Sequence, residues 1–109
     1  KIARFQVTCH KIADMATKVQ LARLITYQAA RMMDTGKADS KTAAMAKMVA
    51  TKAAVEVADE AIQLLGGYGY MSEYDVERFY RDAKALDLTD GAGYALRDTI
   101  GAAVLGRIR

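Results

Sequence analysis

Proline is absent from this chain of 109 residues, and apolar side chains repeat with the period of an α-helix over most of its length. Average usage, at about 5%, would supply about five prolines to a chain this long. Between Arg4 and Thr35 the apolar residues recur at helical steps, which places one side of the segment against a core. They are Phe5, Ile12, Met15, Val19, Ala22, Ile25 and Met32. The pattern predicts a first helix of about nine turns.

A second long helix is predicted from Ser40 to Leu65. The segment "TGKADSK" separates it from the first, with Gly36 near a C-cap and Ser40 as the expected N-cap. Alanines lie all around the circumference of this second helix. Small residues on every side predict neighbouring helices on more than one side.

Two shorter helices complete the pattern. Ser72 and Asp75 stand three residues apart, close to a capping box, and predict a helix over Glu73 to Ala83. The segment "ALDLTDGAG", Ala85 to Gly93, is predicted as a connection, and Ala95 to Arg107 as the last helix.

These four elements predict an all-α fold, because no alternating strand pattern of useful length is present. The architecture expected is an antiparallel four-helix bundle of the up-and-down type, with two long helices and two shorter ones. The whole range 1–109 is expected to form one domain with a thin core. Since the chain begins at Lys1 without an initiating methionine, it is expected to be a piece of a larger protein.

The charge pattern argues against nucleic-acid binding. The chain has 16 basic and 13 acidic residues, a formal net charge of +3, and the two signs alternate instead of forming a basic stripe. No apolar run approaches the roughly 18 residues of a membrane span. The single cysteine, Cys9, rules out an internal disulfide and a multi-cysteine metal site.

The most unusual stretch is "LLGGYGYMSEYDVERFYRDAK", residues 64–84, where three glycines end the alanine-rich pattern. Glycine permits positive φ and close approach of another backbone or a ligand. The stretch is therefore either an elaborate helix stop or a binding loop. It is not a dinucleotide fingerprint, because it follows a helix and lacks the G-x-G-x-x-G spacing.

Two further candidates for chemistry are Cys9 with His10, and Asp90. Neighbouring residues of a helix point about 100° apart, so Cys9 and His10 do not share a site, and a buried thiol beside a polar histidine is expected. Asp90 lies in a predicted connection and precedes Gly91, which lets a substrate approach its carboxylate. A loop aspartate that caps the last helix is the alternative.

Four segments of the chain resemble the C-terminal helical domain of flavin-dependent acyl-CoA dehydrogenases. They are "FQVTCHKIADMA" (5–16), "ARLITYQAARMMDTGK" (22–37), "AAMAKMVAT" (43–51) and "AIQLLGGYGYMSEYDVERFYRDAK" (61–84). They follow the order of the family's patterns over nearly the whole chain. The combination of GGYGY with ERxYRDAK is specific to the family.

This resemblance implies a larger catalytic unit in which FAD lies between several domains and a neighbouring subunit. Family members oxidise the Cα–Cβ bond of an acyl-CoA thioester: a carboxylate removes the α-proton while hydride moves to the flavin. The resemblance implies electron-transferring flavoprotein as the acceptor, a homodimer or homotetramer, and a bacterial cytoplasmic or mitochondrial matrix location.

The resemblance also assigns cofactor contacts. Phe5 and Gln6 match flavin contacts at the start of the first long helix. A second set matches the stretch that binds the adenosine diphosphate part of FAD, usually the FAD of a partner subunit. That set consists of Gln63, Leu64, Leu65, Gly66 and Gly67.

The catalytic base is assigned by the same alignment. Many members carry a glutamate in "YEGT", and Asp90 of "LTDGAG" falls on that glutamate. Aspartate is shorter by one methylene, about 1.5 Å, and a misplacement near 1 Å costs about a hundredfold in rate. Ala92 and Gly93 occupy the family's threonine and serine positions, so they count as flavin-contacting positions that have lost their hydroxyls. Asp75 replaces a proline that is usual in the family.

These departures leave alternatives open. The base could lie upstream of Lys1, as in some relatives, while relatives that use aspartate act on alicyclic acyl-CoAs or on nitroalkanes. A flavin oxidase with an aspartate base is therefore one alternative function. A non-catalytic helical oligomerisation module, which kept the scaffold and lost the chemistry, is the other.

Overall fold

The computed structural model describes residues 1–89, 91 and 93–106, and the regular structure in these ranges is entirely helical. The all-α prediction is confirmed. The helices are α1 (Gln6–Asp34), α2 (Ser40–Leu65), α3 (Gly67–Tyr70), α4 (Val76–Leu88) and α5 (Gly93–Leu105), with short 3-10 turns at Ile2–Arg4 and Ser72–Tyr74.

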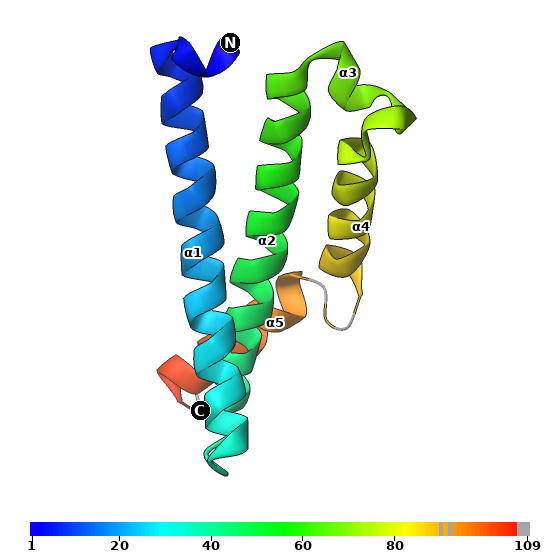
Figure 1. Ribbon diagram of the computed structural model, residues 1–109. Coiled ribbons are helices and arrows are strands. Elements are labelled where there is room, and N and C mark those ends of the chain that lie inside the picture. Colours follow the sequence, from blue (N-terminus) through cyan, green and yellow to red (C-terminus); the bar gives the residue numbers. More distant parts are fainter. Residues whose placement is uncertain (90, 92, 107–109) are drawn as a thin grey trace.

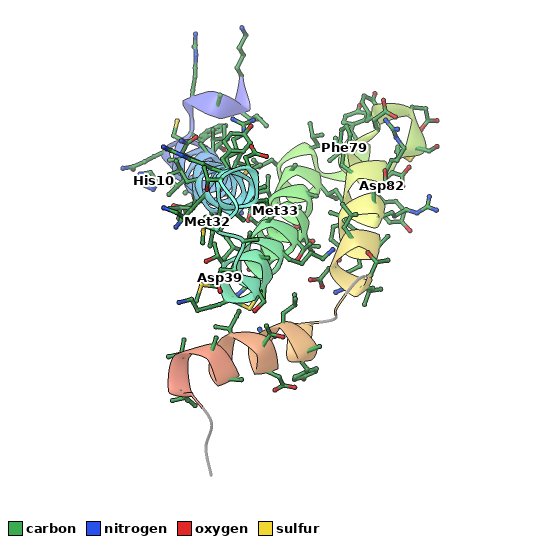
Figure 2. All side chains as sticks on the ribbon, turned by 90° about the horizontal axis from the view of Figure 1, so that it is seen from below. His10, Met32, Met33, Asp39, Phe79 and Asp82 are labelled. Atoms are coloured by element: carbon green, nitrogen blue, oxygen red, sulfur yellow. The ribbon has the colours of Figure 1, made fainter. Side chains whose placement is uncertain are left out.

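Helix α2 lies at the centre of the molecule. It runs antiparallel to α1 on one side and to α4 on the other, and α5 crosses its N-terminal half (Figure 1). The view along the long helices shows α5 on one side of the row formed by α1, α2 and α4, with its axis crossing theirs (Figure 2). The prediction that α2 has neighbours on several sides is therefore confirmed, and its alanines allow the close approach.

The core is thin because three helices in a row can bury only the middle one. Its buried apolar residues are all alanines: Ala44, Ala46, Ala53, Ala58 and Ala83. Helix α1 has no buried residue; a half-buried stripe that includes Met15, Ala22 and Ile25 faces α2. Large apolar side chains such as Phe5, Leu24 and Phe79 are exposed, so much of the surface of the layer is uncovered in the described part of the chain.

The ends of the first helix pair follow from local hydrogen bonding. Gly36 has φ of 70° directly after α1, the left-handed geometry of a helix stop, as predicted. The predicted N-cap of α2 was wrong by one residue. Asp39 is the cap, and its carboxylate accepts from the backbone N–H groups of Lys41 and Thr42, whereas Ser40 is the first helical residue.

The predicted capping box before α4 is also wrong. Ser72 lies in a 3-10 turn, and the cap residue Asp75 makes no side-chain capping bond. Its φ of 58° is a left-handed conformation that the ring of proline cannot adopt, so the aspartate changes how the chain approaches the helix. Helix α4 consequently starts at Val76 and continues to Leu88, five residues beyond the predicted end. Helix α5 starts two residues before the predicted Ala95, and the predicted last residue, Arg107, lies outside the described residues.

Candidate functional site

The predicted adenosine-diphosphate stretch occupies the C-terminal end of α2. Gln63 to Leu65 form its last turn, Gly66 is the C-cap, and Gly67 is the first residue of α3. Gly66 has φ of 61° and ψ of −137°, a combination open essentially to glycine alone. This geometry turns the chain sharply from α2 into α3.

The three glycines of this turn serve three different purposes. Gly66 supplies the positive φ. A Cβ on Gly69 would lie 2.7 Å from the carbonyl oxygen and 2.8 Å from the Cα of Ile62, so this glycine lets α3 pack directly on α2. A Cβ on Gly67 would meet nothing within 4 Å, and its φ is not positive. Neither backbone geometry nor packing within this chain explains Gly67.

Two other predicted cofactor contacts, Phe5 and Gln6, lie at the same end of the molecule. Phe5 is the N-cap of α1 and Gln6 its first residue, and the antiparallel pairing brings this end beside the end of α2 (Figure 1). Phe5 and Gln6 are exposed, as are Gly66 and Gly67. The fold therefore gathers the two predicted sets of contacts into one open surface, the glycine end of the layer.

Ion pairs connect the N-terminal half of α1 to the C-terminal half of α2, next to the glycine end. Lys11 pairs with Glu60, and Lys18 lies 2.7 Å from Glu56, which also receives Lys52 at 3.8 Å. The hydrogen bond from Lys18 lowers the pKa of Glu56, and the same bond raises the pKa of Lys18. These contacts fix the register of α1 on α2.

The tyrosines of the glycine turn are exposed. Tyr68 packs against Tyr74 with ring centroids 5.3 Å apart and an interplanar angle of 59°, an edge-inclined arrangement. Tyr70 is 81% exposed and does not pack on the end of the bundle.

The predicted base lies at the other end of α4. Asp90 and Ala92 are outside the described residues, but their neighbours define the connection: α4 ends at Leu88 and α5 begins at Gly93. In Figure 1 this connection is at the opposite end of α4 from the glycine turn. The end of α4 that leads to the predicted base is therefore the end away from the predicted cofactor stretch.

Glycines shape both sides of this connection. Gly91 has φ of 102°, and a Cβ there would lie 3.3 Å from Cδ2 of Leu96. Gly93, the predicted flavin-contacting position, is the first residue of α5, and its carbonyl accepts a hydrogen bond of 3.0 Å from Arg97 Nη1.

A polar cluster between α2 and α4 was missed by the sequence analysis. Thr51 is buried, and its hydroxyl lies 2.9 Å from the carbonyl oxygen of Lys47 and 3.2 Å from Oδ1 of Asp87. Lys47 Nζ donates to the carbonyl of Leu86 at 2.7 Å. Lys47 and Thr51 are one helical turn apart. Two polar residues on one face of an alanine-rich helix were the feature of the sequence that could have indicated a polar contact with another helix.

Cys9 and His10 form no site. The thiol of Cys9 donates to the carbonyl oxygen of Ala3 at 3.0 Å and is exposed, so the expected burial is wrong. Helix α1 lies at the edge of the layer, and no described element covers its outer side. Figure 2 shows His10 on the side of α1 away from α2. The described residues contain no cluster of three metal-ligating side chains. None of the helices in the described ranges is both long and apolar enough to cross a membrane.

An apolar groove lies between α2 and α4, along the length of α4 from the glycine turn to the connection that follows the helix. It has a volume of about 460 Å³ and is lined by residues that include Val57, Ala61, Val76, Phe79 and Leu86. The single acidic residue in its lining is Asp82. The groove has no polar cluster that could bind a reacting group, so it does not extend either candidate site.

Comparisons with known proteins are consistent with this geometry. The family described as "Acyl-CoA dehydrogenase, C-terminal domain" matches residues 1–105. "Cyclohexane-1-carbonyl-CoA dehydrogenase" of Geobacter metallireducens is 46% identical over 94 residues, which are 86% of this chain and 25% of that protein. "Caffeyl-CoA reductase-Etf complex subunit CarC" of Acetobacterium woodii is 42% identical over 105 residues, 96% of this chain and 28% of that protein.

The fold agrees with solved structures as well. The butyryl-CoA dehydrogenase of Megasphaera elsdenii superposes with a TM-score of 0.92 at 40% identity, covering 94% of this chain and 27% of that one. The chain thus spans roughly a quarter of the length of the relatives it matches.

Proposed function

Because this chain belongs to the acyl-CoA dehydrogenase family, as its C-terminal helical domain, we propose that it is part of a larger FAD-dependent enzyme. The proposed reaction is α,β-dehydrogenation of an acyl-CoA thioester. The flavin, when bound, accepts the hydride that leaves the β-carbon. The chain's own contribution is a surface that binds the cofactor and a carboxylate that removes the α-proton.

The observation that carries this proposal is the open backbone at Gly66 and Gly67. Among the described residues, apart from the adjoining backbone, no atom lies within 4 Å of a Cβ built on either residue, and both are exposed. Bare backbone of this kind lets N–H groups approach a pyrophosphate without interference from side chains. The residues present therefore fit the adenosine-diphosphate part of FAD, with Gln63, Leu64 and Leu65 beside it and Phe5 and Gln6 at the same end.

Asp90 is the proposed base. A thioester acidifies the α-proton, and a positioned carboxylate is a suitable acceptor for it. Since the connection after α4 lies far along that helix from the glycine turn, we propose that the two ends serve different active sites in a homodimer or homotetramer (Figure 1). The large apolar side chains left exposed on the layer favour such an assembly.

The shorter base favours a substrate that is bulky at its α-carbon. Aspartate leaves about 1.5 Å more room than glutamate between backbone and substrate. In a cyclohexane-1-carbonyl thioester the α-carbon is a ring atom and needs that room, and the relative from Geobacter metallireducens is named for this substrate. We therefore place an alicyclic acyl-CoA ahead of a straight-chain one, with a flavin oxidase and a non-catalytic module as the remaining alternatives.

The electron acceptor and location remain part of the proposal. The relative from Acetobacterium woodii is named as a subunit of a complex with Etf, which supports electron-transferring flavoprotein as the partner. A bacterial cytoplasm or a mitochondrial matrix would supply it.

Replacement of Asp90 by asparagine in the full-length enzyme tests the proposal. Asparagine keeps the shape and removes the basic oxygen, so flavin reduction by cyclohexane-1-carbonyl-CoA should slow at least about a hundredfold with FAD content unchanged. Asp98→Asn, on the exposed surface of α5, is the matched control and should reduce its flavin at the wild-type rate. An Asp90→Asn enzyme as fast as this control would mean that the base is elsewhere.

A further inference from the structure

We propose that Lys47, Thr51 and Asp87 form an α4 anchor that positions the connection carrying the catalytic base. The inference rests on the proposed function of Asp90, and it assigns to these three side chains a positioning role for that residue. They do not touch the reacting atoms. They act by fixing the C-terminal end of α4, from which the chain reaches Thr89 and then Asp90.

The first contact is between Thr51 and Asp87. Thr51 is 8% exposed, and its single hydroxyl hydrogen is shared between two acceptors, the Lys47 carbonyl at 2.9 Å and the Asp87 carboxylate at 3.2 Å. Because the hydroxyl is buried on α2, its bond to Asp87 can form only when α4 sits at one height along α2. The bond therefore sets the register of the two helices.

The second contact is between Lys47 and the end of α4. The last carbonyls of a helix have no intrahelical donor and carry the negative end of its dipole. Lys47 Nζ donates to one of them, that of Leu86, at 2.7 Å. A cation from α2 thus holds the last turn of α4 two residues before its end at Leu88.

The lowered pKa of Asp87 keeps its carboxylate ionised, which allows it to accept the hydrogen bond from Thr51. Lys84, one turn earlier on α4, lies 3.2 Å from Oδ2 of Asp87 and is the main cause of its lowered pKa, and the Thr51 hydroxyl acts in the same direction. Lys47 adds a further favourable charge. At neutral pH the ionised carboxylate of Asp87 is therefore an acceptor for the hydroxyl of Thr51.

The apolar part of the α2–α4 contact fixes the position of α4 along α2 less strictly than the hydrogen bonds do. Its buried members, Ala58 and Ala83, are small and apolar, and the groove beside them is about 460 Å³ in volume. Helix α5, at the other side of the connection, also packs on α2. Both helices that flank the connection are therefore held by one central helix, and the anchor fixes the end of α4 from which the chain continues to Asp90.

The functional consequence follows from the sensitivity of proton transfer to distance. A misplacement near 1 Å costs about a hundredfold in rate, and a loosened anchor samples the correct position for part of the time. We expect Thr51→Val and Lys47→Met each to slow flavin reduction about tenfold. FAD content and the apparent affinity for substrate should stay unchanged, because neither residue belongs to the predicted cofactor contacts or to the connection that carries the predicted base.

The experiment uses the FAD-loaded full-length enzyme and two readouts. The first is amide hydrogen exchange over residues 86–93, which needs no substrate and should accelerate at least about fivefold in Thr51→Val and Lys47→Met. The second is the single-turnover rate of flavin reduction with α-deuterated cyclohexane-1-carbonyl-CoA, whose isotope effect should rise in the same variants as proton removal becomes slower.

Two controls separate anchoring from general destabilisation. Thr51→Ser keeps the hydroxyl and should restore both the exchange rate and the reduction rate. Lys52→Met removes a lysine from the same helix that pairs with Glu56, on the side of α2 that faces α1, and should leave both rates unchanged. Exchange over residues 86–93 at the wild-type rate in Thr51→Val and Lys47→Met would overturn the anchor.

Failure of the base and failure of the anchor give different results. If Asp90→Asn is fast while the anchor variants exchange faster, Asp90 is not the base, and the connection is held for another purpose. That result overturns the positioning of a base. If Asp90→Asn is slow while the anchor variants behave as wild type, the base stands and the anchor is overturned.

Discussion

The two ends of α2 are built by different means. At its N-terminal end the carboxylate of Asp39 accepts hydrogen bonds from two backbone N–H groups and, at 2.7 Å, from the hydroxyl of Thr42. At its C-terminal end Gly66 and Gly69 act through the absence of a side chain. The first end depends on polar chemistry and on pH, whereas the second depends on space and can be broken by one methyl group.

The largest effect should come from Gly69→Ala. The added Cβ would lie 2.7 Å from a backbone oxygen of α2, and neither α2 nor α3 can move without breaking the turn. We expect the free energy of unfolding to fall by about 3 kcal/mol, at the upper end of overpacking costs. Urea unfolding measures it, with Gly101→Ala as the control.

Gly101 lies within α5 with open space around its Cα, so alanine there should be neutral or stabilising. A Gly69→Ala variant as stable as this control would show that α3 does not rest on α2 as described.

Gly66→Ala should have the next largest effect, for a different reason. Nothing lies within 4 Å of the new methyl, so the cost comes entirely from φ of 61° with ψ of −137°. Holding a non-glycine residue in such a region costs about 2 kcal/mol. Urea unfolding should show this loss, and Gly66→Asn should lose a similar amount, because ψ of −137° lies outside the αL region that asparagine tolerates. Equal stability of all three proteins would contradict the geometry of the turn.

Much of this fold could be predicted from the sequence, because its long helices carry strong periodicity. Helix α2 was predicted with both ends correct, since the five residues before it, 35–39, contain a glycine and a good N-cap, and glycines follow it. The cap was misassigned because Asp39 and Ser40 are both good caps, and only the backbone decides between them. Helix α4 was misplaced because the left-handed conformation of Asp75 has no reliable signature in sequence.

The candidate site could be predicted only in part. The glycine turn stands out because consecutive glycines interrupt an alanine-rich helix, and its residues do gather with Phe5 and Gln6 at one end. The separate purposes of Gly66, Gly67 and Gly69 depend on φ and on distances to Ile62, which no sequence pattern encodes. The α4 anchor joins residues 36 positions apart, Thr51 and Asp87, and a long-range polar contact of this kind needs the tertiary structure.

Asp39→Ala should have a smaller effect on stability than either glycine substitution. Loss of the cap leaves N–H groups of α2 without their side-chain acceptor, and we expect the midpoint of thermal unfolding to fall by roughly 3–5 °C. Asn at this position should keep most of the stability, because its side-chain oxygen can cap as well.

The same residue predicts a pH dependence. The hydroxyl of Thr42 is the main cause of the lowered pKa of Asp39. A lowered folded pKa means that the cap stabilises the protein above the ordinary value, roughly pH 4, and that this stabilisation is lost as the pH falls through the folded pKa. The difference in midpoint between wild type and Asp39→Asn should therefore shrink or change sign below pH 4. A constant difference across that range would show that the carboxylate is not the cap.

Gly67→Ala should have the smallest effect on stability, and it separates folding from function. The methyl meets no atom within 4 Å and the backbone is not at positive φ, so the midpoint of thermal unfolding should move by no more than about 2 °C. The same methyl would stand between the backbone and the pyrophosphate if FAD binds at the glycine end. In the full-length enzyme we therefore expect FAD to bind at least about tenfold more weakly, since a single steric conflict of 1.4 kcal/mol suffices for that. Fluorescence titration of the apoenzyme measures the affinity, and Gly101→Ala again serves as the control. If Gly67→Ala binds FAD as tightly as this control, the bare backbone at residue 67 does not face the cofactor, and the purpose of the second glycine must be sought in a contact with another domain.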